Sequence, residues 1–218
     1  MNNLDKTSID ALIFDMDGTL WDAVDSYCEV WNACFRKFGV ERTVMRDELL
    51  KCMGLPLDVI YKNITGDNPQ IAPTDYLPEL EKLEMKMMPH LGGRPYPIMK
   101  EGMAKLSEHY RIFLLSNCGV RGLEDMMDFT GIRPFVTEAV TFGATQREKS
   151  ENMLWLKKKY ELSNPIYIGD TEGDCRQTRM AGMPFAFAAY GFGSCENPDW
   201  SFNSFEELTD YFIKAKAE

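Results

Sequence analysis

Residues 11–20 read ALIFDMDGTL, a short apolar run followed at once by a polar stretch that contains two aspartates. An apolar run of this length, with turn-forming residues behind it, predicts a strand that is buried on both faces of a sheet. The strand then ends in Asp15 and Asp17, and two buried carboxylates without a partner would be costly. A divalent cation held by their oxygens would compensate them, so the sequence predicts a metal site at the end of this strand.

Three later apolar runs have the same form and predict three further strands. They are IFLL at 112–115 before Ser116-Asn117, IYI at 166–168 before Gly169-Asp170, and FAFA at 185–188 before Tyr190-Gly191. Helical periods lie between them, at 98–109, 123–129 and 151–160. The alternation predicts an α/β fold, a Rossmann-like doubly wound parallel sheet flanked by helices.

Residues 22–90 break this alternation, because they contain apolar positions at helical spacing and no convincing strand. One apolar face is made by Tyr27, Val30, Trp31, Cys34 and Phe38, and a second by Tyr76, Leu77, Leu80, Leu83 and Met87. We therefore predict a helical insertion at 22–90 within a catalytic core formed by 1–21 and 91–218. The exit at 89–97 is rich in Gly and Pro, which is typical of a linker that lets an insertion move.

Composition narrows the class of protein. The chain has 218 residues, 44% of them apolar, so it can bury a substantial core. It contains neither a membrane-length apolar run nor a secretory signal, which predicts a soluble, cytoplasmic protein without a membrane partner. A net charge of −10 and the lack of a basic cluster argue against nucleic acid as a partner. Six cysteines without a C-x-x-C pair favour neither a zinc site nor a disulfide framework.

A second pair of carboxylates follows another predicted strand, at Asp170 and Asp174. An isolated D-x-D is ordinarily turn or cap chemistry. Here two acidic clusters end two parallel strands, and such ends converge on one crevice of a doubly wound sheet, where ligands bind. We therefore expect both clusters to contribute to one metal site.

Four segments resemble, in order and spacing, the four motifs of haloacid-dehalogenase-like hydrolases: DMDGTL at 15–20, LLSN at 114–117, Lys149 before a helix, and GDTEGD at 169–174. The insertion at 22–90 resembles the small α-helical, C1-type cap domain of that family, and the whole chain looks like its phosphoglycolate-phosphatase branch. The resemblance implies a magnesium-dependent phosphoric monoester hydrolase. Its substrate would be a small phosphorylated metabolite, phosphoglycolate-like or a sugar phosphate, cleaved through an aspartyl-phosphate intermediate.

The resemblance also implies roles for individual residues. Asp15 corresponds to the nucleophile and Asp17 to the general acid and base, which protonates the leaving alkoxide and later activates water. Ser116, Asn117 and Lys149 correspond to the phosphate-binding groups, and Lys149 also offsets repulsion between Asp15 and the phosphate.

For the metal, the resemblance implies Mg²⁺ held by the carboxylate of Asp15, the main-chain carbonyl of Asp17 and the carboxylate of Asp170. Asp174 would hold one of these ligands in place or contact the metal through water, and direct binding of the metal by Asp174 stays open.

Lys149 is followed by Ser150, where the family commonly has Pro. Ser suits a helix N-cap as Pro suits the first turn, so the helix can still begin there. Arg147 is an alternative cation for this role.

Two other readings of the chain stay open. A phosphoglucomutase-like phosphotransferase would carry an acidic residue where Gly169 stands, so hydrolysis is favoured. A non-catalytic binding module retaining the fold is disfavoured because every catalytic carboxylate is present, and a dehalogenase would lack Asp17.

The identity of the substrate depends on the cap, in which Arg42, Arg46 and Lys51 could reach an anionic tail or could be ordinary surface charges. The oligomeric state is equally open.

Overall fold

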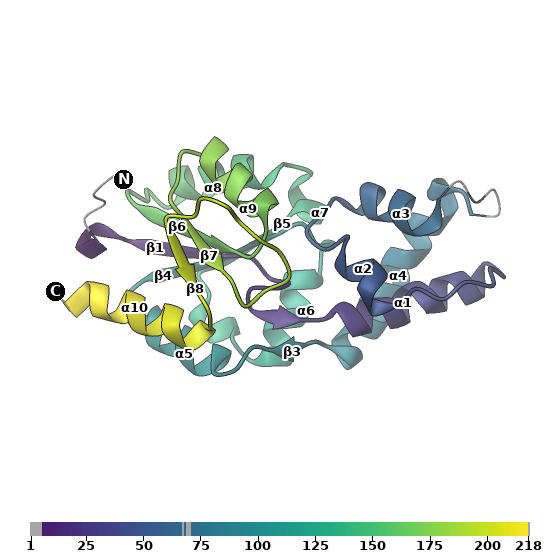
Figure 1. The fold of residues 1–218 in the computed structure, drawn as a ribbon, viewed down its shortest axis with the longest axis horizontal. Helices are drawn as coiled ribbons and strands as arrows, with labels where there is room; N and C mark the ends of the chain where they lie inside the picture. The colour runs from purple at the N-terminus through teal and green to yellow at the C-terminus, as the bar shows by residue number, and fades with distance from the viewer. Residues whose placement is uncertain (1–5, 67, 69–70, 218) are drawn as a thin grey trace.

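A six-stranded parallel sheet, in the order β5-β4-β1-β6-β7-β8, forms the centre of the computed structural model, which describes residues 6–66, 68 and 71–217 (Figure 1). The strands are β1 (Ala11–Phe14), β4 (Arg111–Ser116), β5 (Glu138–Thr141), β6 (Pro165–Gly169), β7 (Phe185–Ala188) and β8 (Trp200–Phe202). The predicted α/β fold is confirmed, with all four predicted strands in place. Two strands of this sheet, β5 and β8, were not predicted, and neither were the two short strands β2 (Trp21–Asp22) and β3 (Arg94–Pro95) outside it.

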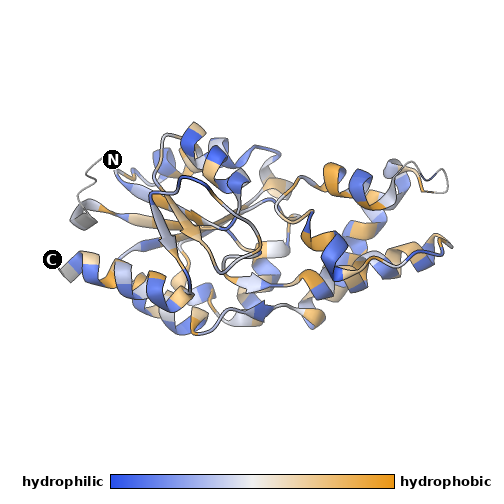
Figure 2. Ribbon diagram, in the orientation of Figure 1, coloured by the Kyte–Doolittle hydropathy of each residue, from blue (hydrophilic) through white to orange (hydrophobic). Residues whose placement is uncertain are grey.

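Helices cover both faces of the sheet. Strand β1 lies between β4 and β6, and all four of its residues are fully buried. Ala11 and Ile13 face α8 (Lys149–Lys159) and α9 (Glu172–Met180), whereas Leu12 and Phe14 face α5 (Met99–Ser107) and α10 (Phe205–Ala217). Figure 2 shows the strands as a largely hydrophobic layer between helices striped with polar residues. This two-sided burial explains why the strands are continuous apolar runs.

The predicted helices at 98–109, 123–129 and 151–160 correspond to α5, α6 (Gly122–Thr130) and α8. The short helix α7 (Phe142–Thr145) and the 3₁₀ turns η1 (Lys6–Ser8) and η2 (Arg133–Phe135) complete the region around the sheet. None of the helices in the described part of the chain combines the length and apolar character that crossing a membrane requires.

The described residues between β2 and β3 form four helices: α1 (Val24–Lys37), α2 (Arg46–Leu50), α3 (Leu57–Thr65) and α4 (Pro73–Leu91). In Figure 1 they lie together at the end of the molecule opposite the two chain termini. Helices α1 and α4 pack through Tyr76, whose ring centroid lies 5.7 Å from that of Trp31 and 5.4 Å from those of Phe35 and Phe38. The two predicted apolar faces of the insertion therefore meet each other.

The two connections of this helical segment run side by side. Strand β2 (Trp21–Asp22) at its start pairs antiparallel with β3 (Arg94–Pro95) at its exit. Before β3, Gly92 has a φ of +60°, and a Cβ atom there would lie 2.2 Å from the ring of Phe129. Glycine is thus required by both conformation and packing. The mobility expected of this exit stays a prediction.

Candidate active site

Three neighbouring strands end at the same place and bring together residues that are far apart in the sequence. Asp15 directly follows β1, Ser116 ends β4 and Asp170 directly follows β6. The backbone N–H of Asp15 donates to the carbonyl of Ile168 at 2.8 Å, which fixes Asp15 to the neighbouring strand. All three side chains are at most 5% exposed. The carboxyl ends of the strands thus form a buried polar site, as expected for a doubly wound sheet.

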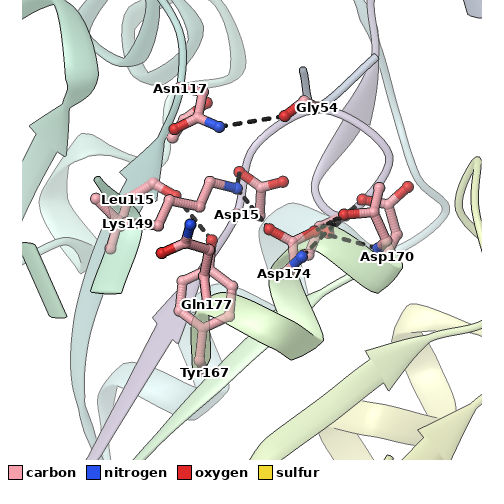
Figure 3. Close-up of polar contacts among 12 residues, drawn as sticks. Asp15, Gly54, Leu115, Asn117, Lys149, Tyr167, Asp170, Asp174 and Gln177 are labelled. Atoms are coloured by element: carbon pink, nitrogen blue, oxygen red, sulfur yellow. Dashed lines mark hydrogen bonds and ion pairs between the residues drawn. The ribbon is translucent and has the colours of Figure 1, made fainter. Parts of the chain in front are cut away.

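Lys149 supplies a positive charge to this site. Its Nζ atom lies 2.9 Å from Oδ1 of Asp15 and 2.6 Å from Oδ1 of Asp174 (Figure 3). Burial lowers the pKa of Lys149, but the two carboxylates raise it more, so that it lies well above its usual value. Lys149 therefore stays charged, and the alternative cation, Arg147, is exposed.

The helix that carries Lys149 begins differently from the expectation. Its N-cap is Glu148, whose side chain accepts from the N–H of Glu151 while the Glu151 side chain accepts from the N–H of Glu148. Ser150 lies inside α8 instead of capping it. This reciprocal capping box fixes the start of α8 and with it the position of Lys149.

Asp15, Asp170 and Asp174 form a cluster in which one carboxylate oxygen of each lies within 4.8 Å of the others. Asp174 is held by Thr171, whose N–H and hydroxyl donate to Oδ2 at 3.1 and 2.6 Å. Asp170 accepts from the N–H of Phe192 at 2.8 Å. Burial is the main cause that raises the pKa of Asp15 to about 6 and that of Asp170 well above its usual range.

This cluster fits a divalent cation. Among the described residues, three buried carboxylates face a single ammonium, so negative charge exceeds positive charge in the site. Hard cations such as Mg²⁺ prefer oxygen ligands of this kind. The approach of Asp170 also explains the glycine of the first motif, because Gly18 has a φ of +78° and a Cβ there would lie 2.0 Å from Oδ2 of Asp170. The absence of a side chain at Gly18 therefore lets the first and fourth motifs pack against each other.

Asp17 stands apart from this cluster. The indole N–H of Trp21 donates to Oδ1 at 3.0 Å, and the hydroxyl of Tyr27 donates to Oδ2 at 3.4 Å. Burial and the charge of Asp15 raise the pKa of Asp17 to about 8, against the opposing effect of these two hydrogen bonds. The raised pKa favours the protonated form of Asp17. Since Tyr27 belongs to α1, this carboxyl also contacts the helical insertion.

The residues after β4 complete the polar end of the site. The Ser116 hydroxyl accepts from the N–H of Cys118 at 3.4 Å, and the Asn117 side chain donates to the carbonyl of Gly54 at 3.2 Å (Figure 3). Gly54 lies between α2 and α3, so Asn117 joins the sheet region to the insertion.

Asp15, Asp17, Ser116, Asn117 and Lys149 all line one cavity of about 130 Å³. Its other wall comes from the insertion, with residues of α1, α2, α3, α4 and the loop after α2. Nearly all predicted site residues therefore meet at this cavity, and Asp170 and Asp174 lie behind it, beside Asp15.

The candidate cations of the insertion lie elsewhere. Arg46 pairs with Asp22 and Asp25, and Arg42 pairs with Glu48. Neither of them, nor exposed Lys51, lines the cavity. In the structure, Arg42, Arg46 and Lys51 therefore have the surroundings of ordinary surface charges.

Sequence reasoning did not assign Trp21, Tyr27, Glu84 or Arg121 to the site, although all four line the cavity. Tyr27 was placed only on an apolar helix face. Its position twelve residues after Asp15 carries no signal by itself, because the contact with Asp17 depends on how α1 packs against the sheet region.

Comparison with known proteins agrees with this architecture. Residues 12–188 match the family model described as haloacid dehalogenase-like hydrolase, so the chain belongs to this family. The predicted class of enzyme, a phosphoric monoester hydrolase, is confirmed at this level.

The chain is similar to a phosphoglycolate phosphatase from Aliivibrio fischeri, with 24% identity over 86% of this chain and 87% of the relative. A phosphoglycolate phosphatase from Psychrobacter arcticus is also 24% identical, over 94% and 96% of the two chains.

Among solved structures, a haloacid dehalogenase-like family hydrolase from Streptococcus pneumoniae superimposes with a TM-score of 0.83 at 20% identity, over 94% of this chain and 99% of that one. CbbY from Rhodobacter sphaeroides, in complex with xylulose-(1,5)bisphosphate, gives 0.76 at 16% identity, over 92% and 96%. At this identity the structural matches show a shared fold.

Proposed function

We propose that this protein is a magnesium-dependent phosphatase that hydrolyses a small phosphate monoester through an aspartyl-phosphate intermediate. The observation that carries the proposal is the different surroundings of two carboxyls in one cavity: Asp15 faces the ammonium of Lys149, while Asp17 accepts hydrogen bonds from Trp21 and Tyr27 and has a pKa raised by burial. Two carboxyls with separated pKa values suit a nucleophile and a general acid. The names of the curated relatives, phosphoglycolate phosphatases, support the same class of reaction.

In the first step an oxygen of Asp15 attacks phosphorus, and the bond from phosphorus to the ester oxygen breaks. The electron pair of that bond stays on the ester oxygen, which takes the proton of Asp17 and leaves as an alcohol. In the second step ionised Asp17 removes a proton from water, and the resulting oxygen attacks the aspartyl phosphate. Asp15 and inorganic phosphate are released, and Asp17 is protonated again.

Other groups of the chain support these steps. Ser116, Asn117 and Lys149 would bind phosphoryl oxygens, and Lys149 keeps Asp15 ionised by lowering its pKa. Asp15, Asp170 and the carbonyl of Asp17 would hold Mg²⁺, with Asp174 behind them. When bound, the cation would offset the charge of the phosphoryl group beside these carboxylates.

The helical segment 22–90 would act as a cap over the core formed by 1–21 and 91–218. Its contacts with Asn117 and Asp17 support this role, because both reach from the insertion to the strand ends. A closed cap would exclude bulk water from the aspartyl phosphate. The proposal includes a small phosphorylated substrate and the cytoplasmic location expected from the sequence.

The test is hydrolysis of p-nitrophenyl phosphate, an aryl ester that needs few contacts with the cap. Exhaustive chelation should stop hydrolysis, and Mg²⁺ should restore it, whereas Ca²⁺ should restore little because its looser coordination misaligns the reacting groups. Full activity after chelation would refute the magnesium role. No hydrolysis with Mg²⁺ present would refute the phosphatase assignment.

A further inference from the structure

The cavity has a polar end at the strand termini and a far end made by the helical insertion. One face of α4 contributes Glu81, Glu84, Met85 and Met88, at the spacing of neighbouring turns. The rest of the far wall is apolar and aromatic, with residues such as Trp31, Leu49, Leu55, Leu57 and Ile60. The part of a substrate that lies beyond the phosphate would therefore meet apolar surface and two carboxyl groups.

Few of the residues that the structure describes bring positive charge to the cavity. Among the described residues that line the cavity, the cations are Lys149 and Arg121. Lys149 is engaged by Asp15 and Asp174, and Arg121 donates to Asp125 at 2.8 Å, one turn further along α6. A site that binds a carboxylate tail needs a cation or free N–H groups aimed at it. The insertion supplies no such cation from the residues that the structure describes.

Glu84 is the polar group best placed to read the substrate. It is partly buried, and its Oε2 atom lies 3.9 Å from the point where a Cβ on Gly119 would be, so it reaches across to the loop after β4. Within the described residues it forms no ion pair, unlike Glu79 on the same helix, which pairs with Lys37. Burial, and secondly Glu81, raise the pKa of Glu84 to about 7. Among the described residues, therefore, none supplies a cationic partner for the Glu84 carboxyl.

We infer that the substrate is a phosphate monoester of a small amino alcohol, whose protonated amine pairs with Glu84, and that esters with a carboxylate tail are poor substrates. The inference rests on the proposed phosphatase function and deepens it. The ammonium group of the substrate would neutralise the charge of the Glu84 carboxylate. The methylene carbons of the amino alcohol would pack on Met85 and Met88. A carboxylate tail would instead lie against Glu81 and Glu84, where like charges repel. The substrate class would then differ from the one named in the curated relatives.

The test compares three esters of similar size: O-phosphoethanolamine with an ammonium tail, ethyl phosphate without a charge, and phosphoglycolate with a carboxylate. We expect kcat/KM to fall in that order, with about tenfold between the first and the last, since tenfold corresponds to about 1.4 kcal/mol of one charge contact. Phosphoglycolate as the best of the three would overturn the inference, and so would equal values for all three.

Variants of Glu84 sharpen the result. In Glu84→Gln the ratio of kcat/KM for O-phosphoethanolamine to that for ethyl phosphate should drop severalfold, and Glu84→Lys should make phosphoglycolate better than O-phosphoethanolamine. The matched control is Glu79→Gln, which removes the same charge from α4 outside the cavity and should leave the order of the esters unchanged. An unchanged order in Glu84→Lys, with circular dichroism showing a folded protein, would overturn the inference.

Binding separates this inference from the proposed function. In Asp15→Asn, calorimetry with Mg²⁺ measures the Kd of each ester without turnover, and O-phosphoethanolamine should bind more tightly than phosphoglycolate. If p-nitrophenyl phosphate is not hydrolysed by the parent, the proposed function fails, while the ratio of the two Kd values still decides the inference. Tighter binding of phosphoglycolate, or equal binding of both, would sink it even in an active phosphatase.

Discussion

The two ends of the cavity are built in different ways. At the strand ends, each carboxyl has partners: Asp15 has Lys149, Asp174 has Lys149 and Thr171, and Asp17 has Trp21 and Tyr27. At the end formed by the insertion, the wall is apolar, and Glu84 has no cationic partner within the described residues. A preorganised polar cluster is what phosphoryl transfer needs, whereas an incomplete wall leaves contacts for a substrate to make. Under the proposed function, this difference places the chemistry at the sheet and the selectivity at the insertion.

Substitution of the proposed nucleophile, at the polar end of the cavity, should have the largest effect on the rate of hydrolysis. Asp15→Asn should lower kcat for every ester by about 10⁴-fold or more, because no other group replaces an attacking carboxylate. The fold should survive, since the substitution removes a carboxylate whose ionisation is opposed by burial. Turnover and thermal unfolding of the purified variant measure both effects. Activity near that of the parent would remove Asp15 from the role of nucleophile.

The residues at the polar end of the cavity could be predicted from the sequence to a larger extent than those at the far end. Asp15, Ser116, Lys149, Asp170 and Asp174 could be predicted to meet, because the ends of parallel strands have fixed positions and the motif order matched a known family. Strands β5 and β8 escaped because EAVT at 138–141 mixes polar residues with apolar ones and WSF at 200–202 is only three residues long. Helix α10 also escaped, although its amphipathic pattern is helical.

The wall of the insertion could not be predicted in the same way. Helical spacing shows which residues share a face, but it does not show which face borders a cavity and which packs against another helix. On α4, Tyr76 and Leu80 are buried in the helix pair, whereas Glu81 and Glu84 line the cavity one turn away. From the sequence alone these two glutamates resemble ordinary solvent-exposed positions.

The dependence of kcat/KM on pH tests the two carboxyls at the polar end. Asp15 must be ionised and Asp17 protonated, so for an alkyl ester the rate should fall above pH about 8 and below pH about 6, approaching tenfold per pH unit on each side. A bound cation would shift the acidic limb to lower pH, because positive charge lowers the pKa of Asp15.

Asp17→Asn is the matching variant for the pH profile. It should lower the rate by about 10² to 10⁴-fold and abolish the basic limb, because no proton is then lost from position 17. A basic limb that persists unchanged in Asp17→Asn would assign that limb to another group.

Tyr27→Phe tests the contact between the insertion and the polar end. The variant loses the hydroxyl that donates to Asp17 and that lowers its pKa, so the basic limb should move to higher pH and kcat should fall by about fivefold. The shift of the limb separates a positioning role from general loss of packing, since a purely structural defect lowers kcat without moving the limb. Trp31→Phe is the control, because Trp31 lies on the same helix and also lines the cavity. The hydrogen bonds to the Asp17 carboxyl come from Trp21 and Tyr27, so this variant should leave the basic limb in place.

The smallest effect is expected at the far end, in the stability of Glu84→Gln. Because the pKa of Glu84 is raised from 4.5 to about 7 in the folded protein, the folded state holds this proton more tightly than the unfolded state does. The free energy of unfolding of the parent should therefore decrease as pH rises from about 4.5 to about 7, and the full cost is present above that range. Glutamine does not ionise, so the variant should match the parent at pH about 4 and exceed it by about 1 kcal/mol at pH about 8, a value discounted for partial exposure.

Urea unfolding of parent and Glu84→Gln at both pH values measures this difference, and Glu79→Gln is the control on the same helix. Glu79→Gln should behave in the opposite way, because Lys37 lowers the pKa of Glu79 and loss of that ion pair can only weaken the folded state at neutral pH. Parallel stability curves for parent and Glu84→Gln would show that Glu84 ionises without cost. The apolar wall at the far end would then not oppose a charge on Glu84, and the contrast between the two ends would disappear.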